Sequence, residues 1–282
     1  MQLATVTREG RRAVGVLEGD RVRLLPGDGD MLALIRGWPG VGVPSGGESV
    51  ALSSVTVEAP IPRPARNVFC IGKNYREHAK EFAGSGFDAS AQEVVPEAPV
   101  VFTKPPSAVI GPGQPIPSHL DPTNSVDYEG ELTVVIGRGG RGIARADALS
   151  HVFGYTIIND VTARTIQHRH RQWVLGKGID GFCPMGPVIL TADEVPDPTA
   201  LRLRTFVNGE KRQDAVVADL IFDIPTLIET ISAGITLEPG DLIATGTPAG
   251  VGLGFSPPRF LRPGDVVRIE VDRIGTLENP VA

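Results

Sequence analysis

Acidic residues alternate along one stretch of the chain at a spacing that could bind a cation. Asp127, Glu129 and Glu131 precede an apolar, β-branched run from 132 to 136 that is closed by Gly137, so we expect a strand here. Side chains two residues apart share one face of a strand, so the three carboxylates would stand in a row. Such a row is either a solvated strand end on the protein surface or one side of a cation site.

Asp160 is a further acidic residue at the expected end of a buried strand. It follows the apolar run 154–158 and precedes a segment, Val161 to about Trp173, that we expect to be helical. Asp160 is therefore either the N-cap of this helix or a third oxygen ligand beside Glu129 and Glu131. A set of carboxylates with room for water favours Mg²⁺, Mn²⁺ or Ca²⁺ over Zn²⁺.

His78 and Glu81 lie three residues apart in a short expected helix, from Tyr75 to about Phe82. Residues at this spacing are neighbours on a helix, so Glu81 could orient His78 and stabilise its charged form. An oriented imidazole can act as a general base toward water. The alternative is an exposed ion pair without a catalytic role.

Three basic residues lie in apolar or glycine- and proline-rich surroundings, where a cation needs a partner. They are Lys104, Arg164 and Lys177. Together they could hold an anionic substrate. The alternative for each residue taken alone is a solvated surface side chain.

Two glycine-rich segments, at 137–142 and 250–254, resemble nucleotide-binding loops. The first opens no convincing helix, and the second runs into Ser256-Pro257-Pro258. Neither segment has the strand–loop–helix context of a dinucleotide fold, so we interpret both as turns.

The composition indicates a globular protein with many turns and few helices. The 282 residues include 34 glycines and 25 prolines, and 41% are hydrophobic. A third helix is expected from the N-cap Asp223, through Pro225 in its first turn, to Gly234. The remainder is mostly strand and turn, which predicts an α+β fold dominated by β structure.

A proline-rich joint from Pro60 to Pro64 divides the expected fold. We expect a small β-rich N-terminal domain over residues 1–62 and a catalytic domain over residues 63–282. Small residues and glycines between Phe82 and Pro99 predict a flexible segment that could close over a site as a lid.

The net charge of −6 argues against a nucleic-acid-binding surface and against a basic membrane-binding patch. Cys70 and Cys183 form no metal-binding pair, and Cys70 lies in an apolar run that predicts a buried thiol. The first residues lack the apolar centre of a signal peptide, and no run reaches the ~18 apolar residues of a membrane helix. We therefore expect a cytoplasmic protein without nucleic-acid or membrane partners.

With these motifs the sequence resembles the fumarylacetoacetate hydrolase family. The match runs in order along the expected catalytic domain, through segments 71–78, 102–105, 127–132, 154–164, 175–187, 237–252 and 274–281. The resemblance implies a mixed β-roll catalytic fold with few helices, and usually a homodimer. One departure is Thr165, where the family commonly has Asp after Ala-Arg. The missing carboxylate leaves the orientation of Arg164 open.

The resemblance also implies roles for individual residues. It implies Mg²⁺ or Mn²⁺ held by Glu129, Glu131 and Asp160, with Ca²⁺ as a substitute in a crystal. It implies that His78 and Glu81 form the base, on a helix that orders when ligand binds. The residues that would line the substrate site are Tyr75, Lys104, Arg164, Gln167, Lys177 and Thr247.

The activity implied by the resemblance is hydrolytic C–C cleavage of a 2,4-dioxo acid, an acylpyruvate such as fumarylpyruvate. The metal would chelate the substrate's carboxylate and 2-oxo oxygen, and His78 would activate a water for attack on the distal carbonyl. Lys104 and the catalytic Lys177 would stabilise negative charge on the pyruvate enolate. The alternatives on the same scaffold are an oxaloacetate decarboxylase, a 2-hydroxyhepta-2,4-diene-1,7-dioate-type isomerase, and a non-catalytic metal-binding protein.

Overall fold

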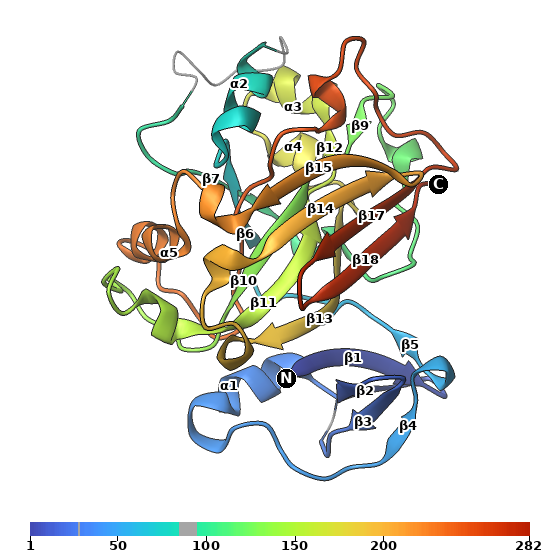
Figure 1. Cartoon of the computed structure of the whole chain (residues 1–282), viewed down its shortest axis with the longest axis vertical. Helices are drawn as coiled ribbons and strands as arrows, with labels where there is room; N and C mark the ends of the chain where they lie inside the picture. Colours follow the sequence, from blue (N-terminus) through green and yellow to red (C-terminus); the bar gives the residue numbers. More distant parts are fainter. Residues whose placement is uncertain (28, 85–94) are drawn as a thin grey trace.

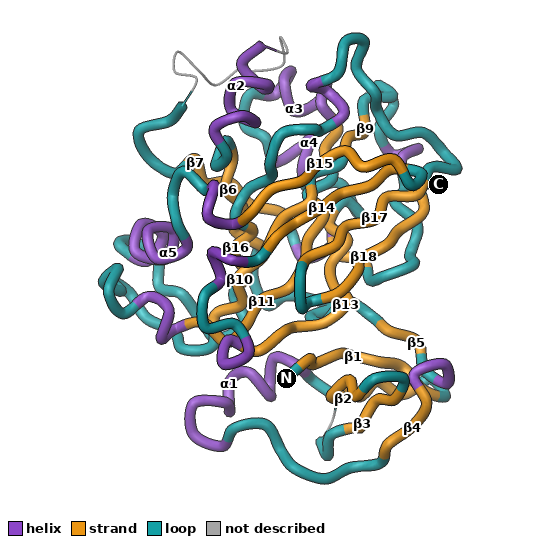
Figure 2. Tube along the Cα trace, viewed as in Figure 1, coloured by secondary structure: helices purple, strands orange, loops and turns teal. Residues whose placement is uncertain are grey.

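The structure is a computed structural model, and it describes residues 1–27, 29–84 and 95–282 (Figure 1). The described part is dominated by strands, which form a large mixed sheet, a smaller antiparallel sheet beside it and one short strand pair (Figure 2). The described α-helices are short and few. The predicted α+β fold with dominant β structure is therefore confirmed.

The large sheet contains 12 of the described strands. In spatial order its main path is β4 (Ser49–Ala51), β3 (Arg21–Leu24), β2 (Arg11–Glu18), β1 (Gln2–Arg8), β13 (Cys183–Thr191), β11 (Val152–Asn159), β10 (Gly130–Ile136), β16 (Leu242–Ala244), β6 (Val68–Gly72) and β7 (Val100–Lys104). Two further strands pair with this path: β5 (Thr56–Val57) with β1, and β8 (Val109–Ile110) with β13.

The central strands of this sheet are apolar along most of their length because both of their faces are covered. β10, β11 and β13 are buried at nearly every position. The antiparallel register of β10 and β11 places Gly130 opposite Asn159 and Glu131 opposite Ile158. This register brings the acidic start of β10 beside the end of β11.

A four-stranded antiparallel sheet covers one face of these central strands (Figure 1). Its order is β15 (Glu210–Val216), β14 (Arg202–Val207), β17 (Val266–Val271) and β18 (Gly275–Pro280). Buried and more exposed residues alternate along β14 and β17, as expected for a sheet with one face on the core. The two sheets are in contact where β14 lies near β10 and β18 lies near β13.

The described residues form five α-helices: α1 (Met31–Val41), α2 (Arg76–Gly84), α3 (Arg164–His170), α4 (Val174–Lys177) and α5 (Ile224–Ser232). The prediction for α5 is confirmed, since Asp223 is its N-cap and accepts a hydrogen bond from Thr226 N at 2.9 Å. α2 begins one residue later than predicted. α1 is not among the predicted helices, because Gly37, Pro39 and Gly40 within it are poor helix formers.

The predicted helix from Val161 to Trp173 is wrong in its extent. Its first residues form strand β12 (Thr162–Ala163), which pairs with β9 (Val126–Asp127). α3 therefore starts only at Arg164, with Ala163 at the N-cap position. The interpretation of Asp160 as a helix N-cap is thus also wrong.

The N-terminal unit continues the large sheet. β1 pairs with β13 through Gln2 opposite Leu190 and Leu3 opposite Ile189. The domain boundary at residue 62 stays a prediction. The expected lid between Phe82 and Pro99 also stays a prediction, because residues 85–94 lie outside the described residues. Among the described helices, none is long and apolar enough to cross a membrane.

Replacing Asp223 with alanine tests the cap of α5. The Asp223 carboxylate accepts hydrogen bonds from both the N–H and the hydroxyl group of Thr226. We expect Asp223→Ala to lower the free energy of unfolding by about 1 kcal/mol in denaturant titrations. Glu97→Ala is the control, since Glu97 is exposed and lies outside any described helix or strand. An equal loss in both variants would contradict the capping role.

Candidate active site

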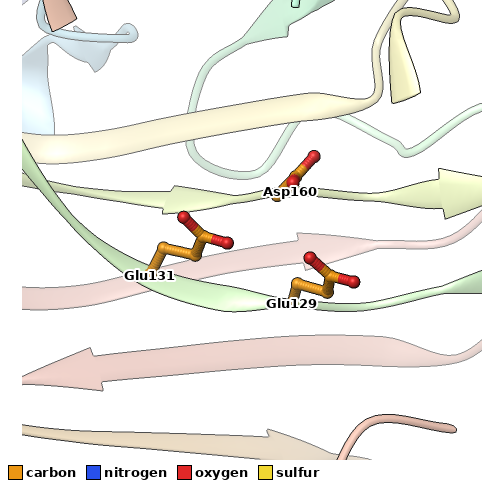
Figure 3. Close-up of side chains that lie close together, drawn as sticks. All are labelled: Glu129, Glu131 and Asp160. Atoms are coloured by element: carbon orange, nitrogen blue, oxygen red, sulfur yellow. The ribbon is translucent and has the colours of Figure 1, made fainter. Parts of the chain in front are cut away.

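Three buried carboxylates meet at the junction of β10 and β11 (Figure 3). Glu129 directly precedes β10, Glu131 is the second residue of β10, and Asp160 follows the end of β11. One carboxylate oxygen from each residue lies within 4.8 Å of the other two. Backbone pairing sets this arrangement, because Asp160 N donates a hydrogen bond to the Glu129 carbonyl at 2.8 Å. The three residues predicted as metal ligands therefore form one cluster.

Asp127 does not belong to this cluster, so the prediction of three carboxylates on one strand face is wrong. The strand is interrupted at Tyr128-Glu129, because β9 ends at Asp127 and β10 starts at Gly130. The Asp127 carboxylate lies instead 2.9 Å from Arg164 Nε and is fully buried. Asp127 therefore acts on a neighbouring side chain rather than on the cluster directly.

Three buried cations surround the triad of Glu129, Glu131 and Asp160. Lys177 Nζ lies 2.8 Å from Glu129 Oε2 and 2.7 Å from Asp160 Oδ2. Lys104 Nζ lies 2.6 Å from Asp160 Oδ1. Arg164 Nη1 lies 2.6 Å from Glu129 Oε1. All three cations are almost completely buried, so the alternative of solvated surface side chains is wrong.

The negative charge of the triad is unevenly compensated. Burial raises the pKa of Glu129, but the charges of Lys177 and Arg164 outweigh this effect and lower the pKa to about 2. Burial, together with repulsion from Asp160 and Glu129, raises the pKa of Glu131 well above its ordinary value. A further positive charge beside Glu131 would favour its ionised form. Three hard oxygen donors in this setting fit a divalent ion such as Mg²⁺ or Mn²⁺.

His78 and Glu81 form a buried pair on α2. His78 Nδ1 lies 3.1 Å from Glu81 Oε2, and the two side chains are only 6% and 15% exposed. The alternative of an exposed ion pair is therefore wrong. Since Nδ1 contacts Glu81, the other ring nitrogen, Nε2, is left to exchange a proton with a ligand.

One cavity is lined by both His78 of this pair and Glu129 of the triad. The predicted site residues in its wall are His78, Glu129, Arg164, Gln167, Lys177 and Thr247. The Thr247 hydroxyl donates to the Gly130 carbonyl at 3.0 Å, which fixes it at the start of β10. The cavity therefore brings a candidate base, one acid of the triad and two cations into contact with one small volume.

Five predicted site residues do not line this cavity, namely Tyr75, Glu81, Lys104 and the triad members Glu131 and Asp160. Lys104 lies behind the triad, where it also donates to the Val161 carbonyl at 2.9 Å. Glu81 supports His78 from its far side. Tyr75 is buried and lines a different cavity, so the structure does not bring its side chain to the wall of the candidate site.

An aromatic wall of the cavity is not predicted by the sequence motifs. Trp173 packs edge-on against Phe102 and Phe82, with ring centroids 5.2 and 6.2 Å apart. Lys177 Nζ lies 5.1 Å from the centre of the Phe102 ring. The three rings come from separate segments of the chain, so no local pattern reveals that they form one surface.

The orientation of Arg164 does not require a carboxylate at position 165. Asp127 holds Nε at 2.9 Å, and Gln167 Oε1 accepts from Nη1 at 3.3 Å. Thr165 contributes through its backbone N–H, which donates to Ser125 Oγ at 3.0 Å. Asp127 and Gln167 thus orient Arg164 in place of the missing acid.

The fold is similar to solved structures over its whole length. The structure of a fumarylacetoacetate hydrolase from Exiguobacterium antarcticum matches with a TM-score of 0.87 and 42% identity, covering 100% of this chain and 99% of that chain. The structure of maleylpyruvate hydrolase from Sphingobium sp. SYK-6, in complex with manganese(II) and pyruvate, matches with a TM-score of 0.79 and 34% identity. That comparison again covers 100% of this chain and 99% of the other.

The sequence is also similar to characterised proteins and to a family model. Oxaloacetate tautomerase YisK of Bacillus subtilis is 54% identical over 231 residues, which are 82% of this chain and 74% of that protein. The model described as fumarylacetoacetate (FAA) hydrolase C-terminal matches residues 67–282. This span includes the triad, the cations and the His78–Glu81 pair. The chain is thus a member of the fumarylacetoacetate hydrolase family.

Proposed function

We propose that this chain is a divalent-metal-dependent enzyme that interconverts the keto and enol forms of a 2-oxo dicarboxylic acid, with oxaloacetate as the expected substrate. The 54% identity to oxaloacetate tautomerase supports this reaction. The cavity also supports this reaction, because His78, Arg164 and Lys177 line it together with Glu129 of the triad.

The observation that carries this proposal is an unpaired donor on Arg164. Among the described residues, Arg164 Nη2 is buried and has no hydrogen-bond partner, whereas Nε and Nη1 contact Asp127 and Glu129. Leaving a buried donor unpaired costs free energy, which a substrate carboxylate at Nη2 would offset. Arg164 lines the same cavity as His78, so a bound acid would lie within reach of the candidate base.

The side chains of the site would divide the reaction among them. Arg164 would hold a substrate carboxylate, and His78 would take a proton from the carbon next to the 2-oxo group. His78 would then deliver a proton to the enolate oxygen, directly or through solvent, which gives the neutral enol. Glu81 would orient His78 and stabilise its protonated form, while Lys177 would stabilise the negative charge that develops. Bound by Glu129, Glu131 and Asp160, a divalent ion would supply Lewis-acid polarisation of the 2-oxo oxygen.

Hydrolytic C–C cleavage of an acylpyruvate is the second candidate function. The buried His78–Glu81 pair is compatible with it as well, because hydrolysis requires a base that activates water. The similarity to the maleylpyruvate hydrolase structure favours it. The two reactions share a pyruvate-like enolate, so the same cations would serve both.

Two further properties complete the proposal: a homodimer, which the family resemblance implies, and a cytoplasmic location, which the sequence leads us to expect. The proposed chemistry uses residues of a single chain and does not depend on either property. Sedimentation velocity of the purified chain tests the first, and cell fractionation tests the second.

A comparison of substrates on the metal-loaded protein decides between the candidate reactions. We expect chelator-treated protein to be inactive. Added Mn²⁺ or Mg²⁺ should restore the activity, measured as a decrease in the oxaloacetate enol absorbance without release of pyruvate. Release of pyruvate and CO₂ from oxaloacetate would indicate a decarboxylase instead of a tautomerase. Pyruvate and a free acid from an acylpyruvate would favour the hydrolase. Activity on a 2-hydroxy-dienoate alone would indicate the isomerase, and no turnover of any substrate would indicate a non-catalytic metal-binding protein.

Removing the imidazole of His78 tests the assigned base. We expect His78→Ala to lower kcat by about 10²–10⁴-fold, the usual contribution of general acid–base catalysis. Mn²⁺ affinity should be unchanged, because His78 is not part of the triad. His119→Ala, at an exposed histidine outside the cavity, is the control and should keep full activity. Full activity of His78→Ala would refute the assignment.

Amide substitutions test which carboxylates bind the ion. We expect Glu131→Gln to weaken Mn²⁺ binding strongly in isothermal titration calorimetry, since a neutral amide replaces one of the three carboxylate ligands. Glu81→Gln changes a nearby acid in the same way, but Glu81 is outside the triad, so this variant should bind Mn²⁺ normally. Equal affinity of the two variants would show that the ion is not held by the triad.

A further inference from the structure

We propose that the glycine-rich segment 250–254 is a positioning element of the active site, whose backbone N–H groups hold the carboxylates of Glu81 and Asp127. Through these two acids the segment would set the positions of His78 and Arg164. The sequence pattern of this segment suggests only a turn. The inference rests on the proposed function, because it assigns supporting roles around the candidate base and the candidate carboxylate clamp.

Three backbone donors of the segment point at these two acids. Gly250 N donates to Glu81 Oε1 at 3.0 Å. Gly252 N donates to Asp127 Oδ1 at 2.7 Å, and Leu253 N donates to Asp127 Oδ2 at 3.0 Å. Hydrogen bonds to ionised carboxylates are stronger than those between neutral groups, so both acids are firmly held.

Each of these two acids contacts one side chain of the cavity that is proposed to act in the reaction. Glu81 Oε2 lies 3.1 Å from His78 Nδ1, and Asp127 Oδ2 lies 2.9 Å from Arg164 Nε. His78 and Arg164 both line the cavity. Only the side chain of Glu81 therefore lies between the segment and the candidate base His78. Only the side chain of Asp127 lies between the segment and Arg164, the residue proposed to hold the substrate carboxylate.

The two carboxylates closely approach two of the three glycines of the segment, Gly252 and Gly254. A Cβ atom on Gly254 would overlap the carboxyl group of Glu81. A Cβ atom on Gly252 would lie 2.6 Å from Asp127 Oδ1 and would overlap the Arg259 carbonyl. Any larger residue at these positions would displace the acids that the backbone holds.

The segment is itself anchored, as a positioning element must be. The Tyr128 hydroxyl donates to the Gly250 carbonyl at 2.8 Å, and Arg259 N donates to the Gly252 carbonyl at 2.8 Å. Val251 and Leu253 are buried in one apolar cluster with Phe82 and Trp173, two residues of the aromatic wall. The segment is therefore packed against the cavity wall.

Gly254→Ala tests this inference without disrupting the backbone. The added methyl group would meet the flexible end of the Glu81 side chain, so the fold is kept and the carboxylate must move away from His78. We expect kcat to fall by about tenfold or more while KM stays unchanged. In a Glu81→Ala background the methyl group has space, so Gly254→Ala should cause no further loss. Gly234→Ala is the matched control, because nothing lies within 4 Å of its added Cβ.

A spectroscopic readout separates this inference from the proposed reaction. The chain has five histidines, so imidazole ¹⁵N signals can be assigned by substitution. We expect the His78 ring shifts of Gly254→Ala to match those of Glu81→Ala, whether or not the wild-type protein turns over oxaloacetate. Wild-type ring shifts in Gly254→Ala, or an equal loss of kcat with and without Glu81, would overturn the inference.

Asp127→Asn tests the second arm of the element. The substitution preserves side-chain volume but replaces the carboxylate with a neutral amide, which faces the N–H donors of Gly252 and Arg164. The position of the Arg164 side chain should therefore be less firmly fixed. We expect pyruvate to bind the Mn²⁺-loaded variant about tenfold more weakly, with Mn²⁺ affinity and the circular dichroism spectrum unchanged. Unchanged pyruvate affinity would overturn this arm. If the variant does not fold, Gly254→Ala still decides whether the segment positions the site.

Discussion

The fold is built around a group of buried charges that no single element could bury alone. Four carboxylates, on Asp127, Glu129, Glu131 and Asp160, share the interior with the cations of three other side chains, Lys104, Arg164 and Lys177. Moving one such charge out of water without a partner costs several kcal/mol. Each of these charged groups is therefore stable in the interior only when its partners are in place. This requires the observed sheet register, the pairing of β9 with β12 and the start of α3 at Arg164. Because the acids outnumber the cations, the cluster is also suited to take up a further positive charge.

The parts of the site that the sequence predicts are those with local signals. Glu129 and Glu131 share a face because they are two residues apart, and Asp160 marks the end of an apolar run. The capped start of α5 is likewise predicted by residues that are adjacent in the sequence. Asp127 is not predictable in this way, because the pairing of β9 with β12 decides where the strand is interrupted. The same pairing shortens the helix that the residues after Asp160 would otherwise favour.

Contacts between distant segments explain the rest of the site. Gly250 and Glu81 are 169 residues apart in the sequence, and Gly252 and Asp127 are 125 apart. A local pattern can reject a nucleotide-binding loop in segment 250–254, and that rejection agrees with its short 3₁₀ turn. It cannot show which side chains the backbone donors meet. The aromatic wall is hidden for the same reason, since each ring by itself resembles an ordinary core residue.

The pairing of β1 with β13 has a consequence for the exposed edges of the large sheet. β13 lies beside β11 near the centre of the fold, and without β1 its residues Ile189 and Leu190 would have an open edge on the other side. An apolar strand with unpaired backbone groups is a template for association with other chains. The N-terminal strands therefore cover part of an apolar strand edge, and a chain without them would expose that edge to other chains even with every site residue intact.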